Sequence, residues 1–283
     1  QGYRVTYLGV DAKGRLNLDE YADALTPDTA LVSIMFANNE IGTIQPIKEI
    51  AQICQSKKII FHTDAVQAVG HLKIDVKDLQ VNMLSISSHK FHGPKGIGAL
   101  FVKRGTPLFN FIYGGAQENT RRGGTSNVAG AVGMATALEE ATAEMEKVAK
   151  HEIELRDLLF EELSKIPHSC INGSIEKRLP NNFNMCFEGI EGESLLLLLN
   201  EKGICVSSGS ACTSGSLDPS HVLLAIGLPH DVAHGSLRIS LSKFNTKDEI
   251  LTTIEAVKSV VEYLRKISPV WDNLVKGVIS HVI

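Results

Sequence analysis

Several features that would assign this chain of 283 residues to a protein class are missing from its sequence. No apolar run approaches the roughly 18–20 residues that a membrane-spanning helix needs, and Leu195–Leu199 is far too short. The formal net charge is only −4, and Lys and Arg are scattered and adjoin at most in pairs, such as Lys57–Lys58 and Arg121–Arg122. No strong field therefore favours nucleic acid or an anionic membrane, and we expect neither as a partner.

A disulfide framework is also missing. The 5 cysteines are an odd number, and no C-x-x-C motif occurs, so zinc and redox-pair sites are not expected. We predict no metal site and a reducing compartment, which is the cytoplasm or, in a eukaryote, the mitochondrial matrix. The five are Cys54, Cys170, Cys186, Cys205 and Cys212.

The first residues contain neither an initiator Met nor a targeting segment. Gly2 followed by the alternating apolar residues Tyr3, Val5 and Tyr7 predicts a helix C-cap and then a strand. We therefore expect Gln1 to be a truncation or cleavage point inside a larger fold. A natural start after removal of Met is the alternative.

The first half of the chain alternates apolar strands with helical segments, which predicts an α/β domain with a mostly parallel sheet. Pro46–Cys54 has the pattern of a helix between two of the strands. Ligands bind such sheets beyond the carboxyl ends of the strands. The expected strands are Leu31–Phe36, Ile59–His62, Met83–Ile86 and Ala99–Val102.

The second half predicts a long helix from Gly130 to Leu163 and then a smaller α+β domain. Expected strands are Asn182–Phe187, Ile204–Ser207 and Ser236–Leu241, and a capping box begins the last long helix at Thr246. We place the domain boundary near Lys147, which gives a large domain of residues 1–147 and a small domain of residues 148–283.

Two segments that follow strands carry groups suited to one cofactor. Asp64 ends a buried strand, where a carboxylate needs a donor or cation. It either caps the next helix or pairs with the protonated pyridine nitrogen of pyridoxal 5′-phosphate (PLP). In Ser87-Ser88-His89-Lys90 the hydroxyls can bind phosphate and Lys90 can form a Schiff base. A P-loop is disfavoured, because Gly93–Gly98 lacks the G-K-[ST] ending.

Three further segments contain candidate binding or reactive groups. Arg121–Asn127 could hold an anion at a helix start, or could be an ordinary solvated turn. Cys212 lies in the Ser/Gly-rich run Val206–Ser216, for which we predict a mobile loop and a nucleophilic thiol. Arg238 lies in an apolar strand and needs an anionic partner, which a substrate carboxylate would supply.

Together these segments resemble group I cysteine desulfurases, which are PLP enzymes of fold type I (aminotransferase class V) that serve iron–sulfur cluster assembly. The resemblance runs from Arg4 to about Gly277, and the phrase Gly215–His221 is closer to the NifS-like branch. It implies a large PLP domain, incomplete here at its N-terminal side, and a small α+β domain that carries the catalytic cysteine. The motifs are Ala37–Gly42, His62–Gln67, Ser88–Gly96 and Ser207–Ser214.

The resemblance also implies residue roles. Lys90 would hold PLP and move the α-proton, Asp64 would pair with the pyridine nitrogen, and Gln67 with the phenolic oxygen. Ser87 and His89 would bind the phosphate. Thr125 from the partner subunit of a homodimer would bind the same phosphate. Arg238 and Asn39 would bind the cysteine carboxylate, and Asn39 would also contact the cofactor. Cys212 would attack the substrate sulfur.

The implied reaction converts L-cysteine to L-alanine and leaves a persulfide on the enzyme for a scaffold or other sulfur-acceptor protein. Two alternatives remain at this point. One is a selenocysteine lyase with the same residues, and the other is a catalytically incomplete fragment that acts only through its fold and partner contacts.

Overall fold

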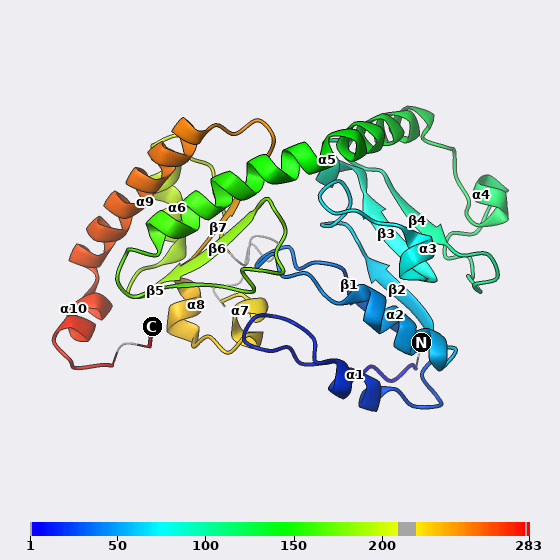
Figure 1. The fold of residues 1–283 in the computed structure, drawn as a ribbon, viewed down its shortest axis with the longest axis horizontal. Coiled ribbons are helices and arrows are strands. Elements are labelled where there is room, and N and C mark those ends of the chain that lie inside the picture. Colours follow the sequence, from blue (N-terminus) through cyan, green and yellow to red (C-terminus); the bar gives the residue numbers. More distant parts are fainter. Residues whose placement is uncertain (1, 209–218, 281) are drawn as a thin grey trace. The chain divides into compact units, whose positions relative to one another are not determined.

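The computed structural model describes residues 2–208, 219–280 and 282–283, and the chain forms two compact units. Unit 2 comprises Ala22–Phe36 and Pro46–Met145. Unit 1 comprises residues up to Tyr21, the short segment Ala37–Gln45 and the chain from Glu146 onward. Helix α5, Val128–Leu163, begins in unit 2 and ends in unit 1 (Figure 1).

Unit 2 is built on a four-stranded sheet in the order β1-β2-β3-β4 (Figure 1). Strands β1, β2 and β3 are parallel and β4 is antiparallel to β3, so the prediction of a mostly parallel sheet is confirmed. Their carboxyl ends share one edge, because Met35 pairs with Asp64 and Asp64 pairs with Ser85. The strands are β1 Leu31–Met35, β2 Ile60–Asp64, β3 Met83–Ser87 and β4 Gly98–Val102.

The helices of unit 2 are short except for α2 and α5. Ile47, Ile50, Ala51 and Cys54 on α2 are buried, which is the face that its apolar spacing predicts. Helix α1 crosses the boundary between the two units at Tyr21. The bounds are α1 Leu18–Ala24, α2 Ile47–Ser56, α3 Val76–Leu79, the 3₁₀ helix η1 Ser88–Phe91 and α4 Gln117–Thr120.

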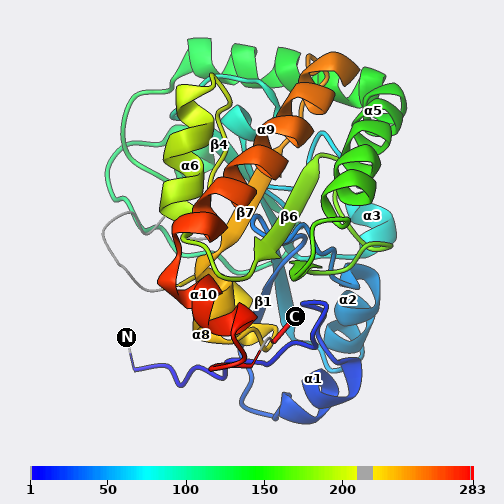
Figure 2. The same cartoon turned by 90° about the vertical axis from the view of Figure 1, so that its left-hand side faces the viewer.

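Unit 1 contains an antiparallel sheet in the order β5-β6-β7, with the long helices α5 and α9 beside it (Figure 2). All six residues of the central strand β6 are buried. The strands are β5 Ser169–Ile171, β6 Asn182–Phe187 and β7 Ser236–Ser240; the helices are α6 Gly192–Glu201, α7 His221–Ala225, α8 His230–His234, α9 Lys247–Ile267 and α10 Pro269–Val275.

The two faces of β6 are chemically different, because side chains alternate along a strand. Phe183, Met185 and Phe187 enter the main apolar core, which α5, α6 and α9 complete. The other face presents two buried amides, Asn182 and Asn184, and then Cys186. A polar strand face inside the fold needs hydrogen-bond partners, and these determine the site described below.

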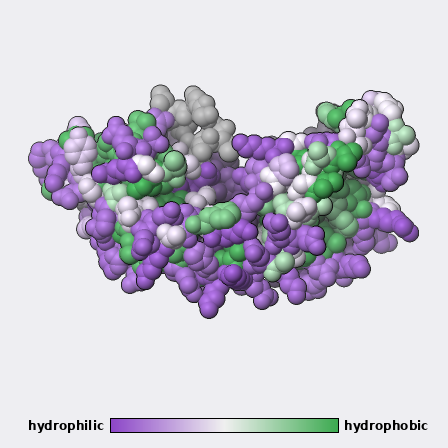
Figure 3. Space-filling view, turned by 90° about the horizontal axis from the view of Figure 1, so that it is seen from above, coloured by the Kyte–Doolittle hydropathy of each residue, from purple (hydrophilic) through white to green (hydrophobic). Residues whose placement is uncertain are grey.

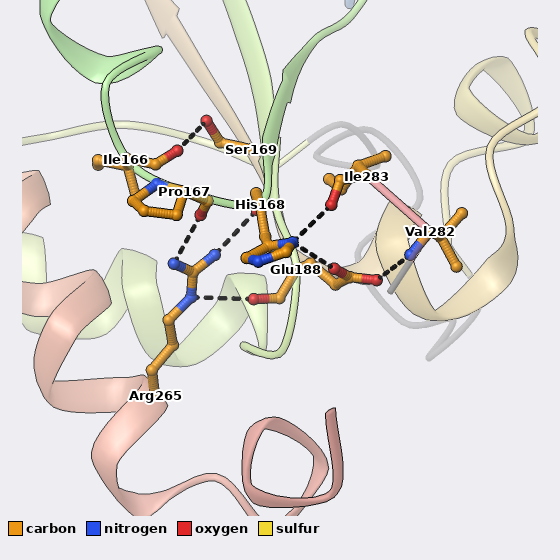
Figure 4. A network of polar contacts seen from close by, with 8 residues as sticks. All are labelled: Ile166, Pro167, His168, Ser169, Glu188, Arg265, Val282 and Ile283. Carbon is orange, nitrogen blue, oxygen red and sulfur yellow. Dashed lines mark hydrogen bonds and ion pairs between the residues drawn. The ribbon is translucent and has the colours of Figure 1, made fainter. Parts of the chain in front are cut away.

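Arg265 of α9 connects this helix to the segments that flank β5 and β6 (Figure 4). Its guanidinium donates to the carbonyls of Glu188, Pro167 and His168 at 3.1, 2.8 and 2.9 Å. It also stacks 3.9 Å from the ring centroid of Trp271. Burial lowers the pKa of Arg265 to about 10, and the nearby charge of Glu188 opposes that shift.

The Glu188 carboxylate continues this network toward the end of the chain. Its Oε1 accepts from Val282 N at 2.8 Å, and its Oε2 lies 3.6 Å from His168 Nδ1 (Figure 4). That imidazole nitrogen is also 2.7 Å from the carbonyl oxygen of Ile283. Polar contacts therefore fix both α9 and Val282–Ile283 to the β5–β6 edge.

Two of the predicted strands are wrong. Residues 3–7 are not part of any strand in the described chain, and Tyr3 and Tyr7 are exposed. Ile204–Ser207 is reduced to an isolated bridge between Ser207 and Arg238. Both segments have the sequence pattern of a strand, but neither forms a continuous row of backbone hydrogen bonds with another strand in the described chain.

The predicted capping box of α9 is confirmed, because Thr246 Oγ1 accepts from Glu249 N and the Glu249 side chain accepts from Thr246 N. None of the helices in the described part of the chain has the length and apolar character needed to cross a membrane.

Candidate functional site

The residues predicted to bind the cofactor lie at the carboxyl edge of the unit 2 sheet. Asp64 is the last residue of β2, and Ser87 is the last residue of β3. Lys90 and His89 follow in η1, whose chain then turns through His92 at a φ of 66°. The parallel arrangement and the strand register therefore bring Asp64 and the Ser87–Lys90 segment to one edge.

Asp64 does not cap a helix, because the residues after it form a turn. Its Oδ1 accepts from Val66 N at 2.9 Å, and this is the only hydrogen bond to the carboxylate from the described residues. Gln67 is half-buried in the same turn. The second carboxylate oxygen of Asp64 is thus available for a cationic donor.

His62 lies on the same side of β2 as Asp64 and is held on both sides by hydroxyls. Its Nδ1 is 2.8 Å from Ser33 Oγ, and its Nε2 is 2.8 Å from Ser85 Oγ. Burial lowers the pKa of His62, and the charge of Asp64 opposes that shift. The His62 imidazole therefore binds a proton less readily than the imidazole of an exposed histidine would.

Ser87, His89 and Lys90 form a group of donors. Ser87 Oγ lies 2.9 Å from His89 Nδ1, while His89 and Lys90 are exposed. Within the described residues, no carboxylate forms an ion pair with Lys90. Ser88 is buried, and its Oγ has no hydrogen-bond partner in that part of the chain.

This set of groups fits PLP. A phosphate requires donors, which Ser87 and His89 offer, and a protonated pyridine nitrogen requires an anion, which Asp64 offers. An unpaired, exposed amine at Lys90 is free to form a covalent bond to an aldehyde. The unpartnered Ser88 hydroxyl adds another polar group beside these residues, so the donor set agrees with the cofactor.

Thr125 lies in unit 2, in the segment before α5, and is exposed. Arg122 of that segment forms an ion pair with Glu118 at 3.2 Å, and Asn127 Oδ1 accepts from Gly130 N at 3.0 Å at the start of α5. Gly123 N donates to the carbonyl of Ile112 at 2.9 Å. The Thr125 segment is therefore joined to the chain around Ile112.

Asn39 and Arg238, the predicted carboxylate ligands, are both in unit 1. Arg238 NH1 donates to the Asn39 carbonyl at 3.3 Å, and Arg238 Nε donates to Ser207 Oγ at 3.0 Å. Both acceptors are neutral, and no acidic side chain pairs directly with Arg238 among the described residues. The half-buried guanidinium therefore has donors left for an anion.

Glu40 is a polar residue of this region that our sequence interpretation did not single out. It is buried, and its Oε2 accepts a short hydrogen bond from Ser220 Oγ. Burial raises the pKa of Glu40, whereas the Ser220 hydrogen bond and the charges of His221 and Arg238 lower it. The position of Glu40 between Asn39 and Gly42 in a turn was the only signal in the sequence, and the spacing of residues could not reveal that Ser220 is its partner.

Cys212, the predicted persulfide carrier, lies outside the described residues. The four cysteines inside the described part are free thiols, of which Cys54 and Cys186 are buried and Cys205 is exposed. The structure thus brings together Asp64, Gln67, Ser87, His89 and Lys90 in unit 2, and Asn39 with Arg238 in unit 1.

Comparison with known proteins identifies the family. The model of the aminotransferase class-V family matches residues 1–252, and the chain belongs to that family. It is 55% identical over 269 residues to "Cysteine desulfurase IscS" of Methanosarcina thermophila, which covers 95% of this chain and 67% of that protein. It is 50% identical over 280 residues to "Cysteine desulfurase IscS" of Clostridium botulinum, covering 98% of this chain and 70% of that protein.

A solved structure agrees with these relatives. A NifS-like protein superposes with a TM-score of 0.86 at 38% identity, covering 93% of this chain and 69% of that chain. The predicted resemblance to NifS/IscS-like proteins and the predicted fold class are therefore confirmed.

Proposed function

We propose that this chain acts as a PLP-dependent cysteine desulfurase, which converts L-cysteine to L-alanine and retains the sulfur for iron–sulfur cluster assembly. Its family and its relatives at 50–55% identity support this function. The observation that carries it is Lys90, an exposed amine without an ion-pair partner among the described residues, in the helix that follows β3, the strand paired with the Asp64 end of β2.

The residues of unit 2 would bind the cofactor. When bound, PLP supplies an electron sink for the pair of electrons left at the substrate carbon. Lys90 would hold PLP covalently and move the α-proton. Asp64 would accept a hydrogen bond from the ring nitrogen, and Gln67 would donate to the phenolic oxygen. Ser87 and His89 would donate to the phosphate, as their 2.9 Å contact and exposure allow.

Arg238 and Asn39 would bind the carboxylate of L-cysteine. The guanidinium is oriented by Ser207 and by the Asn39 carbonyl, and its remaining N–H groups can donate to the substrate in bidentate fashion. Asn39 would also contact the cofactor through its side-chain amide. Carboxylate binding by a fixed guanidinium orients the substrate before its C–S bond is broken.

Cys212 would receive the sulfur. Its thiolate would attack the sulfur of the bound cysteine, forming an S–S bond while the substrate C–S bond breaks. The carbon takes a proton and leaves as L-alanine, so L-cysteine and the Cys212 thiol become L-alanine and a Cys212 persulfide. An acceptor protein with its own thiol would then take the outer sulfur. The Cys212 thiol has to stay reduced between turnovers, which places the protein in the cytoplasm or the mitochondrial matrix.

A second copy of the chain would complete the cofactor site. Thr125 is exposed in its own subunit, and we assign it to the phosphate held by the other subunit of a homodimer. Exposed apolar side chains lie in the same part of unit 2, among them Phe109 and Phe111, each 91% exposed. An apolar surface of this kind typically marks a protein interface.

The decisive experiment compares Lys90→Ala with Lys95→Ala, an exposed lysine of the same segment, in the full chain incubated with PLP. With dithiothreitol present to reduce the persulfide, wild type and Lys95→Ala should form alanine and sulfide from L-cysteine, and borohydride should fix the cofactor to Lys90 in peptide mass spectra. Lys90→Ala should lose the covalent adduct and at least about 10²-fold in turnover, because proton transfer is lost with the amine. Turnover by Lys90→Ala at the wild-type rate would refute the assignment.

A further inference from the structure

Glu40 is a buried carboxylate that the proposed chemistry does not use. Only 7% of its surface is exposed, and it follows Asn39 in the turn that the Ala37–Ile44 bridge closes. A buried carboxylate is costly unless its oxygens accept hydrogen bonds, so its partners indicate why it is there.

The backbone of Glu40 is fixed to the polar face of β6. Its N–H donates to Asn38 Oδ1 at 2.8 Å, and its carbonyl accepts from Asn182 Nδ2 at 3.0 Å and Asn184 Nδ2 at 2.9 Å. Both of these asparagines are buried. The turn that presents Asn39 is therefore held by the backbone of Glu40, and its side chain is free for another task.

That side chain binds the start of α7. Ser220 Oγ donates to Glu40 Oε2, and Ser220 Oγ itself accepts from Val222 N at 3.1 Å and Leu223 N at 3.4 Å. Ser220 is thus the N-cap of α7 and is itself buried. One hydroxyl joins the Asn39 turn to this helix start.

The chain on the other side of Cys212 is bound to the same region. Ser207 N donates to the Arg238 carbonyl at 3.0 Å, Arg238 N donates to the Ser207 carbonyl at 2.7 Å, and Arg238 Nε reaches Ser207 Oγ. Ser207 and Ser220 flank Cys212 in the sequence. Both are therefore bonded to residues next to, or within, the proposed carboxylate site.

We propose that Glu40 is a positioning residue that anchors the chain after Cys212, through Ser220, to the turn that presents Asn39. This rests on the proposed desulfurase function. The anchor fixes one end of the chain that carries the sulfur acceptor relative to the substrate carboxylate ligands, and such positioning raises the rate of a transfer step. It contributes no atom to the reaction, so its loss should affect sulfur transfer and not cofactor binding.

The test compares two substitutions of Glu40 in the full chain loaded with PLP. Glu40→Gln keeps an oxygen that accepts from Ser220, whereas Glu40→Met keeps a similar volume without that acceptor. Glu188→Met, another buried carboxylate of unit 1, controls for general destabilisation. The readouts are hydrogen exchange over residues 219–225, the bound PLP, KM, and the single-turnover rate of persulfide formation.

Glu40→Met should speed exchange over residues 219–225 and slow persulfide formation by about 10-fold or more, with unchanged PLP content and less than about a twofold change in KM. Glu40→Gln should resemble wild type, and Glu188→Met should not slow persulfide formation selectively. A Glu40→Met protein with wild-type exchange and transfer, or with a defect in KM alone, would overturn the proposal.

A second pair of variants covers the possibility that Glu40→Met does not fold. Ser220→Ala removes the donor and Ser220→Thr retains it, so only Ser220→Ala should slow sulfur transfer; equal rates for the two would refute the anchor. If wild type itself forms no persulfide, the proposed function fails, and the exchange over residues 219–225 alone decides whether Glu40 is an anchor.

Discussion

His62 and Asp64 are two residues apart on β2, yet their side chains differ in how many of their polar atoms are hydrogen-bonded. The imidazole is held between the hydroxyls of Ser33 and Ser85, so both of its nitrogens have partners. The carboxylate receives one hydrogen bond, from Val66 N, and retains an oxygen for a ligand. At this edge, both nitrogens of His62 are therefore occupied, whereas Asp64 keeps a carboxylate oxygen for the cofactor contact that we propose.

The lowered pKa of His62 predicts a pH-dependent stability. Burial is the main cause, and the Asp64 charge opposes it, so the folded chain binds this proton less readily than the unfolded chain. The stability contributed by neutral His62 is present above pH 6.5 and is lost as the pH falls through the lower, folded-state pKa. Urea denaturation should show wild type losing more stability below pH 6.5 than His62→Gln, whose side chain does not titrate. Equal losses in the two proteins would contradict this assignment.

Cys212 and Cys205 provide a comparison of two thiols in one part of the sequence. Cys212→Ser should still bind L-cysteine but form no protein persulfide, because a hydroxyl is a much poorer nucleophile toward sulfur than a thiolate. Cys205 is exposed and should be dispensable, so Cys205→Ser should retain the wild-type rate. Mass spectrometry after a single turnover with ³⁴S-labelled cysteine checks both, and label on Cys205 or Cys186 would refute the role of Cys212.

At the scale of elements, the turn from Ala37 to Ile44 depends on Gly42. Gly42 has a φ of +69°, and a Cβ at this position would lie 2.5 Å from Asn182 Oδ1. Asn182 donates to the Glu40 carbonyl and accepts from Arg178, so it cannot move without breaking buried hydrogen bonds. Two demands therefore act on one residue, a left-handed backbone and the absence of a side chain.

Gly203 meets only the first of these two demands, because it has a left-handed φ of +78° but open space where a Cβ would lie. We expect Gly203→Ala to cost about 1 kcal/mol from backbone strain alone. Gly42→Ala should cost about 3 kcal/mol, because it adds the loss of buried hydrogen bonds to that strain. Urea denaturation of both variants measures the difference. Equal destabilisation would mean that the contact with Asn182 is not tight.

The sequence predicts elements well where the apolar pattern and the packing agree. The four strands of unit 2 and the capping box at Thr246 were predictable, because each has strong local signals. The strand β5, Ser169–Ile171, was not, because three residues cannot display a period. The alternating Tyr3, Val5 and Tyr7 misled for the opposite reason, since pairing depends on a neighbouring strand and not on pattern.

The candidate site was predictable to a similar extent. Lys90 and Asp64 follow strands, and the parallel register that unites them is a general property of such sheets. The Glu40–Ser220 hydrogen bond joins residues 180 positions apart, and no local pattern encodes it. The resemblance to a family supplied the candidate binding residues, but only coordinates could show which of them share a hydrogen-bond network.

At the scale of the whole molecule, the chain passes between its two units more than once. The segment Ala37–Gln45 belongs to unit 1, although the residues on both sides of it belong to unit 2. Asn39 is thereby placed with Arg238, which is distant in sequence. Each unit needs segments that are far apart along the chain, so we expect slow folding, since loops must close before these contacts form.

The surface of unit 2 carries an exposed apolar segment that bears on the proposed homodimer. In Figure 3, apolar side chains (green) gather on the right-hand side of the view, over unit 2. Gly123 N donates to the Ile112 carbonyl, and Asn110 Nδ2 donates to the Thr120 carbonyl at 2.6 Å, so the apolar segment and the one before Thr125 form one surface. Its exposed apolar residues are Leu108, Phe109, Phe111, Ile112 and Tyr113.

If this surface is the dimer interface, removing its aromatic anchors should separate the subunits. The double variant Phe109→Ser/Phe111→Ser should weaken dimerisation by on the order of 100-fold or more, since truncating a buried aromatic anchor costs about 2 kcal/mol. PLP affinity should fall with it, because Thr125 would no longer reach the partner's phosphate site. Phe244→Ser, which removes a phenylalanine that is 72% exposed in unit 1, is the matched control and should leave the dimer intact. Sedimentation velocity measures the association, and a double variant that remains dimeric at the concentrations where wild type does would place the interface elsewhere.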